Sequence, residues 1–236
     1  MTQRDFLAIV PARSGSKRLL GKNILDFVGK PLIAWTVEAA KGSGYIDNVL
    51  VSTDSMDIAN AAIDAGASFE GLRKQELAGD NVPLIDVVVD LLSQRAKLPT
   101  FTVLLQPTSP LRTSTHIDEA IELMGDKDAV ISVTKLDKPN EWSSFLPPDM
   151  SLAGFMDAST KNLQSQDLPS RFALNGAIYV VRTERLLIER SFMLSDNIVG
   201  YEMRSDVSID IDTKLDLLMA KGLCLGLDYA IGKLDA

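Results

Sequence analysis

Short runs of hydrophobic residues alternate with stretches of helical periodicity along most of the chain. The runs are compact and rich in Val, Ile and Leu, which predicts buried β-strands. The expected strands are residues 6–10, 48–52, 68–72, 101–106, 129–134 and 177–181. The expected helices are residues 31–41, 54–66, 83–97, 115–124, 184–189 and a last helix from about 213. Strands that alternate with helices are typical of crossover connections, so the pattern predicts a mostly parallel, three-layer α/β sandwich.

Residues 137–172 break this alternation. The segment shows neither helical nor strand periodicity, and it contains Pro139, Pro147, Pro148 and Pro169. A compact domain seldom contains so long a stretch without regular structure unless the stretch has a role of its own. The pattern therefore indicates a functional insertion or an arm that contacts another molecule.

The composition narrows the classes of function. Of 236 residues, 32 are acidic and 24 are basic, which gives a net charge of −8. Nucleic acid is not an expected partner, since proteins that bind duplexes are usually basic. No hydrophobic run approaches the roughly 18 residues of a membrane span, and no signal core follows Met1. We therefore expect a soluble, cytoplasmic protein with no membrane partner.

Cysteine and histidine each occur once. Cys224 alone cannot form an internal disulfide or a cysteine-based zinc site, and its place in an apolar helix predicts a buried, inert thiol. His116 falls in the first turns of an expected helix, where a structural role is more usual than a catalytic one. We therefore expect neither residue to be catalytic.

The loop after the first expected strand has the composition of an anion-binding site. Open α/β sheets bind their ligands at the carboxyl ends of the strands. Four cations fall within ten residues there: Arg13, Lys17, Arg18 and Lys22. Tight turns between them can direct backbone N–H groups at a phosphate, at positions Ser14, Gly15 and Ser16. The loop fits neither the G-x-G-x-x-G nor the Walker pattern, so it predicts another kind of polyphosphate site, or else a solvated basic turn.

A pair of aspartates precedes the last expected helix. In the extended segment 208–213, Ile209 and Ile211 point to one side, so Asp210 and Asp212 point together to the other. Two carboxylates on one face are suited to hold Mg²⁺ together with substrate phosphates. The alternative is surface charge, with Asp212 as the N-cap of the helix.

Three further loops carry polar groups that could bind a ligand; the first follows the strand 101–106 at the ligand edge, and the one with Asn175 precedes a strand. Residues 106–112, Gln-Pro-Thr-Ser-Pro-Leu-Arg, offer an amide, two hydroxyls and a guanidinium on a loop stiffened by two prolines. This combination suits a hydroxylated ligand, or a purely structural turn. The other two loops contain Asn175 with Gly176, and Arg73 with Asp80 and Asn81.

Taken together, these segments resemble the acylneuraminate cytidylyltransferases, also known as CMP-sialic acid synthetases. The motifs occur in the order of the family and extend over nearly the whole chain. They are residues 9–17, 21–23, 51–54, 72–80, 104–112, 174–179 and 208–213. The resemblance implies a Rossmann-like, three-layer αβα nucleotidyltransferase fold. It also implies that residues 1–236 are a single catalytic domain without an appended hydrolase, with 137–172 as an inserted dimerisation arm of a homodimer.

The resemblance implies an activity as well. Enzymes of this family transfer CMP from CTP to the anomeric hydroxyl of a nine-carbon 2-keto sugar acid and release pyrophosphate. Carried over to this chain, CTP contacts fall on Arg13, Ser14, Gly15, Ser16, Lys22, Asn23, Arg73 and Asp80. Sugar contacts fall on Gln106, Thr108, Ser109 and Asn175. Mg²⁺ is the implied cofactor, and the implied catalytic set is its ligands Asp210 and Asp212 with Arg13 and Lys22.

The sequence departs from the family pattern where the sugar acid is bound. Many relatives carry two arginines and a later basic residue at positions that are Gln164, Ser165 and Ala173 in this chain. Lys161 or Arg171 could replace them. The sugar therefore stays open among N-acetylneuraminate, legionaminate, pseudaminate and an octulosonate. A catalytically silent homologue that binds nucleotide is the alternative from another class.

Overall fold

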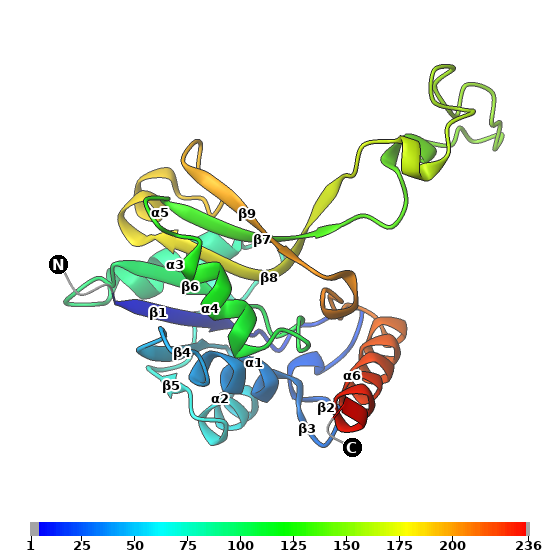
Figure 1. Ribbon diagram of the computed structural model, residues 1–236. Coiled ribbons are helices and arrows are strands. Elements are labelled where there is room, and N and C mark those ends of the chain that lie inside the picture. Colours follow the sequence, from blue (N-terminus) through cyan, green and yellow to red (C-terminus); the bar gives the residue numbers. More distant parts are fainter. Residues whose placement is uncertain (1–4, 235–236) are drawn as a thin grey trace.

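Seven strands form one mixed sheet at the centre of the structure (Figure 1). The computed structural model describes the backbone of residues 5–234 and the side chains of residues 5–226. Across the sheet the order is β5-β4-β1-β6-β8-β7-β9, and every neighbouring pair is parallel except the two pairs made by β8. The strands are β1 (Phe6–Pro11), β4 (Asn48–Ser52), β5 (Ser68–Phe69), β6 (Phe101–Leu104), β7 (Ala129–Lys135), β8 (Phe172–Arg182) and β9 (Ile198–Met203).

Helices cover both faces of this sheet, which confirms the three-layer prediction. Alternate residues of β1 face opposite ways: Phe6 and Val10 belong to one hydrophobic core, and Leu7 and Ile9 to the other. The first core contains side chains of α1 (Leu32–Lys41), α2 (Met56–Asp64), α4 (Ser114–Glu122) and α6 (Lys214–Leu234). The second contains side chains of α3 (Leu84–Ser93) and α5 (Thr183–Glu189). Within residues 5–234, no helix has the length and hydrophobicity needed to cross a membrane.

Several elements were not expected from the hydrophobic pattern. The edge strand β9 has one neighbour, and its sequence Ile-Val-Gly-Tyr-Glu-Met mixes apolar, polar and glycine positions. β8 begins at Phe172 and not at 177, because its first residues pair with the end of β7. A small sheet of β2 (Asp26–Phe27) and β3 (Lys30–Pro31) precedes α1. The 3₁₀ helices are Lys22–Ile24, Gln75–Leu77, Asn140–Trp142, Ser165–Asp167 and Ser205–Val207.

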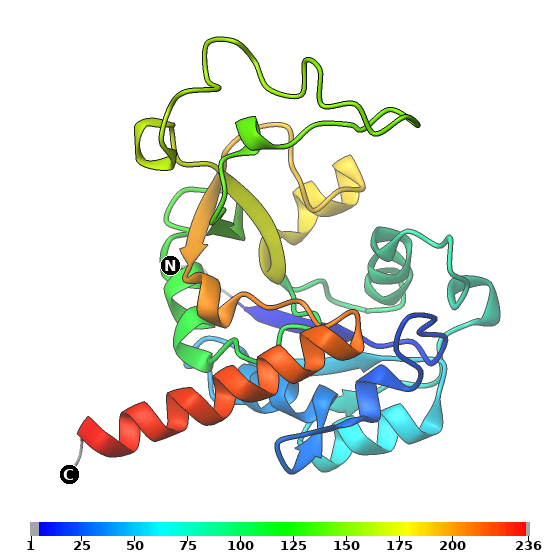
Figure 2. The same ribbon diagram turned by 90° about the vertical axis from the view of Figure 1, so that its right-hand side faces the viewer.

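Residues 137–172 form an arm between β7 and β8. The last paired residues of these strands are Lys135 and Phe172, and the chain between them extends beyond the end of the sheet (Figures 1 and 2). Large hydrophobic side chains are exposed along it, and Phe145 is 99% exposed. Isolated exposed apolar residues are ordinary, but a concentration of them on one projecting segment is typical of an interaction surface.

The carboxyl ends of three parallel strands lie side by side. β1 pairs with β4 on one side and with β6 on the other, so the loops that follow these strands meet at one edge. β8 runs in the opposite direction, and its pairing of Tyr179 with Leu104 places the residues that precede Tyr179 at this same edge. The fold therefore collects segments from distant parts of the sequence at one place.

Candidate active site

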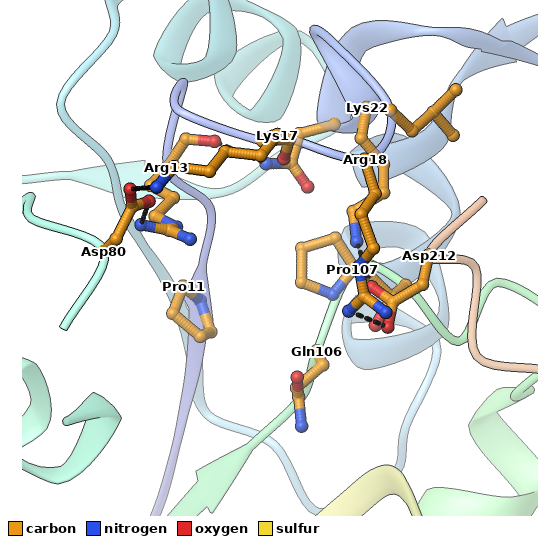
Figure 3. Close-up of a pocket in the computed structure, with 13 residues that line it drawn as sticks. Pro11, Arg13, Lys17, Arg18, Lys22, Asp80, Gln106, Pro107 and Asp212 are labelled. Carbon is orange, nitrogen blue, oxygen red and sulfur yellow. Dashed lines mark hydrogen bonds and ion pairs between the residues drawn. The ribbon is translucent and has the colours of Figure 1, made fainter. Parts of the chain in front are cut away.

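A cavity of about 410 Å³ opens at this edge, next to the end of β1 (Figure 3). It is surrounded by the loops after β1 and β6, the loop before α3 and the segment before α6. Its lining residues are Pro11, Arg13, Ser16, Lys17, Arg18, Leu19, Lys22, Asn23, Asp80, Gln106, Pro107, Thr108 and Asp212. Motifs that are separate in the sequence are thus parts of one site.

Asp80 holds two of the four loop cations. Arg13 and Lys17 both form ion pairs with its carboxylate (Figure 3). The hydrogen bonds from Lys17 and from Arg13 lower the pKa of Asp80, so the carboxyl is ionised at neutral pH. These contacts are solvent-exposed and therefore weak individually. A polyphosphate can replace Asp80 as the partner of these cations at little cost.

Asp212 holds the other two cations on the opposite side of the cavity. Its carboxylate lies 2.5 Å from Arg18 Nη2 and 3.0 Å from Lys22 Nζ (Figure 3). The Lys22 side chain is 12% exposed and that of Arg18 is 69% exposed. Because water screens exposed charges, Lys22 is the stronger electrostatic partner of the two.

The loop after β1 is held in place by its own polar groups. Ser14 donates to the Asp54 carboxylate through its backbone N–H (2.7 Å) and through its hydroxyl (2.8 Å). The Ser16 N–H donates to the Ser14 carbonyl (2.9 Å), and the buried Asn23 amide donates to the Arg13 carbonyl (2.9 Å). Of the three N–H groups at positions 14–16, that of Gly15 has no partner among the described residues. Asp54, the last residue of the motif 51–54, therefore anchors the loop after β1, while Ser55 occupies the N-cap position of α2.

Asp210 and Asp212 lie near enough for their charges to interact, and Asp212, but not Asp210, lines the cavity. Between them, Ile211 is fully buried and its N–H donates to the Thr108 carbonyl (2.8 Å). Although part of Asp210 is exposed, surrounding protein atoms raise the pKa of its carboxyl, and the charge of Asp212 raises it further, while a hydrogen bond with Thr108 opposes the shift. The two carboxylates are thus close enough to repel each other.

The cap of α6 comes from Asp216 and not from Asp212. The Asp216 carboxylate accepts hydrogen bonds from the N–H groups of Asp212 (3.1 Å) and Thr213 (2.7 Å) and from the Thr213 hydroxyl (2.8 Å). The Thr213 hydroxyl in turn accepts from the Asp216 N–H, which is the reciprocal pattern of a capping box. The Asp212 side chain is therefore free of a structural role in the helix and faces the cavity.

Arg73 belongs to a second cavity, of about 220 Å³, that shares Arg13, Asp80 and Gln106 with the first. Its guanidinium donates to the Ser52 hydroxyl (3.2 Å) and carbonyl (2.7 Å) at the end of β4. Burial lowers the pKa of Arg73. The remaining lining is small or apolar: Pro11, Leu77, Gly79, Val82, Leu84 and Val87. A compartment with an apolar wall and a fixed guanidinium is suited to a nucleobase and its ribose.

The buried side chain of Arg112 supports the loop after β6. This side chain is 1% exposed, and its Nη1 donates to the carbonyls of Gln106 (3.2 Å) and Ala177 (3.0 Å). It therefore ties the loop to β8. Burial lowers the pKa of Arg112 to about 9, and its Nε and Nη2 have no hydrogen-bond partner among the described residues.

Comparison with known proteins agrees with this geometry. Residues 7–223 match the sequence model of a family described as cytidylyltransferase. The chain belongs to the cytidylyltransferase family. Its resemblance to the acylneuraminate cytidylyltransferases is confirmed by an N-acylneuraminate cytidylyltransferase of Streptococcus agalactiae serotype III, 39% identical over 230 residues, which are 95% of this chain and 54% of that protein. The chain spans about half the length of the N-acylneuraminate cytidylyltransferases of Streptococcus and Escherichia coli that it matches.

Other relatives act on different sugars. A CMP-N,N'-diacetyllegionaminic acid synthase of Legionella pneumophila is 35% identical over 222 residues, covering 92% of this chain and 95% of that protein. A pseudaminic acid cytidylyltransferase of Campylobacter jejuni is 29% identical over 220 residues, covering 91% and 94%. Among solved structures, a CMP:2-keto-3-deoxy-manno-octonic acid synthetase complexed with CTP aligns with a TM-score of 0.69 at 19% identity, over 94% of this chain and 99% of that one. The last likeness shows a shared fold.

Two residues expected to meet the sugar, Ser109 and Asn175, are buried in the protein interior. Ser109 is 1% exposed, and its hydroxyl has no hydrogen-bond partner within the described residues. Asn175 is 6% exposed; its amide oxygen accepts from the Ser132 hydroxyl (2.6 Å), and its amide nitrogen donates to the Ser208 hydroxyl (3.0 Å). Asn175 thus ties β8 to the aspartate segment. Neither residue lines the cavity, whereas Gln106 and Thr108 do.

A third cavity, of about 320 Å³, adjoins the first through Gln106. Its other lining residues are Leu84, Ile85, Leu104, Leu174, Tyr179, Arg190, Ser191, Phe192 and Met193. Burial raises the pKa of the Tyr179 hydroxyl, and the charge of Asp210 raises it further. Some of its residues belong to the motifs 104–112 and 174–179, but the sequence does not indicate that these motifs meet residues 190–193 in one compartment.

Proposed function

We propose that this cytidylyltransferase transfers CMP from CTP to the anomeric hydroxyl of a nonulosonic acid, releasing pyrophosphate and forming the CMP-sugar. The observation that carries the proposal is the cavity in which the four loop cations, Asp212 and Gln106 meet. Cations for a polyphosphate, a carboxylate pair for a metal and an amide for a hydroxylated acceptor are the groups that this reaction requires. The most similar relatives named above support the choice of CTP.

On the nucleotide side, we assign the triphosphate to the cation loop. Arg13 and Lys22 come from opposite sides of the cavity, and Ser16 lines it as well. Cytosine and ribose fit the second cavity beside Arg73 and Asp80. Both cations already have carboxylate partners, so binding of CTP is an exchange of partners and does not bury unpaired charge.

The aspartate pair fits Mg²⁺. Within residues 5–226, no group of three or more His, Cys, Asp or Glu side chains could enclose a metal by itself. Mg²⁺ commonly uses one or two carboxylates and completes its shell with substrate phosphates and water. Burial raises the pKa of Asp210 and the charge of Asp212 raises it further, and a bound cation would relieve the repulsion between the two carboxylates. Bound Mg²⁺ would supply positive charge shared between these carboxylates and the CTP phosphates.

The reaction is then a displacement at the α-phosphorus. The anomeric oxygen of the sugar forms a bond to phosphorus, the bond to pyrophosphate breaks, and the hydroxyl proton leaves to solvent. The contribution of the protein is to position the two reactants and to neutralise charge. Lys22 and Arg18 face the phosphates, while Gln106 lies at the junction of the nucleotide and sugar compartments.

A homodimer would complete the sugar site. The arm carries exposed apolar side chains, including Phe145, that need a partner surface. Of its three basic residues, Arg171 is paired with Glu141 (2.5 Å), whereas Lys138 and Lys161 make no ion pair within the described residues. We assign Lys161 to the carboxylate of a sugar bound to the partner subunit, in place of the basic residues absent at 164, 165 and 173.

Because CTP is a cytoplasmic metabolite, we expect the reaction in the cytoplasm.

Pyrophosphate release from CTP and Mg²⁺ tests the proposal against a panel of N-acetylneuraminate, legionaminate, pseudaminate and 3-deoxy-octulosonate. Turnover that depends on CTP, Mg²⁺ and a nine-carbon acid is the expected result. Turnover with the eight-carbon acid alone would reassign the acceptor. Thermal stabilisation by CTP without turnover on any acid would favour a catalytically silent nucleotide-binding protein.

A further inference from the structure

The peptide group between Arg13 and Ser14 is held at both ends. Its carbonyl oxygen accepts a hydrogen bond from the side-chain amide of Asn23 (2.9 Å), and its N–H donates to the carboxylate of Asp54 (2.7 Å). Asn23 is 5% exposed, so tight packing restricts its side chain. Because a peptide group is planar, two opposed hydrogen bonds leave it little freedom to rotate. The plane of this group sets the direction in which the Arg13 side chain leaves the backbone.

Both carboxylate oxygens of Asp54 take part in holding the loop. Oδ1 accepts from the Ser14 N–H, and Oδ2 accepts from the Ser14 hydroxyl (2.8 Å). Among the described residues, no other side chain accepts a hydrogen bond from a backbone N–H at positions 14–18. Asp54 lines neither the first nor the second cavity, so it would act on a ligand through the loop and not by contact.

The contact between Ser14 and Asp54 contributes little to the stability of the fold. Ser14 is exposed and Asp54 is half-buried, and an exposed hydrogen bond adds little to the free energy of unfolding. Asp54 does not cap α2 either, because Ser55 occupies the N-cap position. A carboxylate near a polyphosphate site also repels the ligand, so its presence there indicates a role that outweighs the repulsion.

The nucleobase side of the site is anchored independently of Asp54. The Arg73 guanidinium donates to the Ser52 hydroxyl and carbonyl, and the Arg73 N–H donates to the Thr53 carbonyl (2.7 Å). Burial lowers the pKa of Arg73, and the charge of Asp54 opposes that shift. Removing the Asp54 side chain therefore leaves the hydrogen bonds of Arg73 in place and changes only the charge near it.

We propose that Asp54 is a positioning residue for CTP. Together with Asn23 it holds the Arg13–Ser14 peptide group, which orients Arg13 for the triphosphate before the nucleotide binds. When a flexible loop binds a ligand, ordering the loop costs free energy and weakens binding, and a loop that is held in advance avoids this loss. The inference rests on the proposed function, because it takes the phosphates of CTP to be the ligand of this loop.

The test compares CTP binding by the unsubstituted full chain and by Asp54→Ala. Isothermal titration calorimetry with CTP and Mg²⁺, without a sugar acid, gives the Kd in the absence of turnover. We expect the Kd for CTP to rise at least about tenfold in Asp54→Ala, although the variant removes a charge that repels the nucleotide. The KM for the sugar acid should stay within about twofold, because Asp54 bonds to no residue of the loop after β6. A general disturbance of the fold would raise both constants.

Asp54→Asn separates the position of the loop from the charge. Its amide oxygen can accept from the Ser14 N–H and its amide nitrogen can donate to the Ser14 hydroxyl, while the charge is removed. The Kd for CTP should stay within about threefold of that of the unsubstituted protein. Asp57→Ala is the matched control, since Asp57 is an exposed carboxylate on α2 that bonds to no described residue of the loop. It should leave the Kd within about twofold.

A double-mutant cycle shows whether Asp54 acts through Ser14. Ser14→Ala should weaken CTP binding less in the Asp54→Ala background than in the unsubstituted protein, since both variants remove the same contact. Independent, additive losses would overturn the inference.

The binding constants distinguish failure of this inference from failure of the proposed function. Unchanged or tighter CTP binding by Asp54→Ala would overturn the inference and leave the proposed function standing. An equal loss in Asp54→Asn would assign the effect to charge and overturn the inference as well. An unsubstituted protein that does not bind CTP would remove both.

Discussion

The ammonium group of Lys22 lies 3.0 Å from the carboxylate of Asp212, although 190 positions separate the two residues in the sequence. This contact joins the cation loop after β1 to the segment that precedes α6. It is also the better shielded of the two cation contacts of Asp212, since Lys22 is 12% exposed. The cation loop and the aspartate segment therefore interact electrostatically. Removing a charge from one segment should change the electrostatic environment of the other.

Asp212→Ala should lower turnover by more than about tenfold while leaving the fold intact. The variant removes one of two carboxylates that fit Mg²⁺ and leaves Lys22 and Arg18 without their anionic partner. The cap of α6 is unaffected, because Asp216 provides it. Mg²⁺-dependent pyrophosphate release and a thermal melt measure the two effects.

The control for this variant is Asp206→Ala, which removes an aspartate that pairs with Arg204 outside the cavity. It should leave turnover within about twofold of the unsubstituted protein. Near-normal Mg²⁺-dependent turnover in Asp212→Ala would argue against the assigned metal site.

Arg13→Gln should raise the KM for CTP by about tenfold or more. A charge-assisted hydrogen bond to phosphate contributes about 1.5–3 kcal/mol, and glutamine cannot supply the charge. Arg95→Gln is the matched control, since Arg95 pairs with Glu70 and lines none of the three cavities. Steady-state kinetics with varied CTP make the comparison. Equal CTP kinetics in the two variants would show that Arg13 does not bind the nucleotide.

The positions of the motifs could be predicted because each follows an ordinary, well-patterned strand. The runs at β1, β4 and β6 are continuous and apolar, so the sites after their carboxyl ends, including Arg13 and Gln106, could be assigned to the ligand edge. The same reasoning did not identify which other side chains reach the site. Asn175 looked like a ligand residue by its place before a strand, yet it is buried and bonded to Ser132 and Ser208. Short-range sequence does not say which way an amide side chain points.

The third cavity was beyond sequence reasoning for a related reason. Leu174 and Tyr179 lie in the 174–179 motif, but only the reversed direction of β8 brings them to the ligand edge, where they line one cavity with Phe192. The neighbouring strand β9 was not predicted, because an edge strand with Gly200 lacks a buried apolar run. Such compartments form where strands that are distant in the sequence pair with one another. Local patterns of hydrophobic and polar residues contain little information about that pairing.

The stability of the fold should fall as the pH drops below about 6.5, because of His116. Its Nδ1 accepts a hydrogen bond from the Thr113 N–H (3.1 Å) in the capping box of α4. Burial lowers the pKa of His116 from its ordinary value of 6.5, so the unfolded chain binds a proton more readily than the folded chain. The contribution of neutral His116 is complete above that ordinary value and is lost as the pH falls through the lowered pKa.

His116→Gln provides the control, since glutamine can accept the same hydrogen bond without titrating in this range. Melting temperatures from pH 7.5 to 5 should fall more steeply in the unsubstituted protein, by about 1–3 °C over the range. Because His116 is the only histidine, the difference reports on this residue. Identical pH profiles would show that the cap does not depend on the neutral ring.

Gly176→Ala should weaken binding of the sugar acid. A Cβ at this position would lie 3.2 Å from Gln106 Nε2, and the backbone has φ +74°, so the variant combines strain with displacement of the Gln106 amide. Gly29→Ala has similar strain at φ +86° with no neighbour within 4 Å. Both should lose about 1–2 kcal/mol of stability, but only Gly176→Ala should raise the KM for the acid, by about fivefold or more. Matching KM values would indicate that Gln106 does not position the acceptor.

Complementation between two impaired variants, measured at an acid concentration below KM, can test whether the arm contributes to the partner's site. Lys161→Ala should raise the KM for the sugar acid at least about tenfold, through the loss of a charge-assisted hydrogen bond. A heterodimer of a Lys161→Ala subunit with an Asp212→Ala subunit contains one complete site if Lys161 acts across the interface, and none if it acts within its own chain. After subunit exchange in an equal mixture, about a quarter of the sites should be complete, so activity should rise well above that of either variant alone.

No recovery from a mixture shown by native mass spectrometry to contain heterodimers would place Lys161 outside the partner's site. A monomer in solution, measured by sedimentation, would overturn the dimer itself.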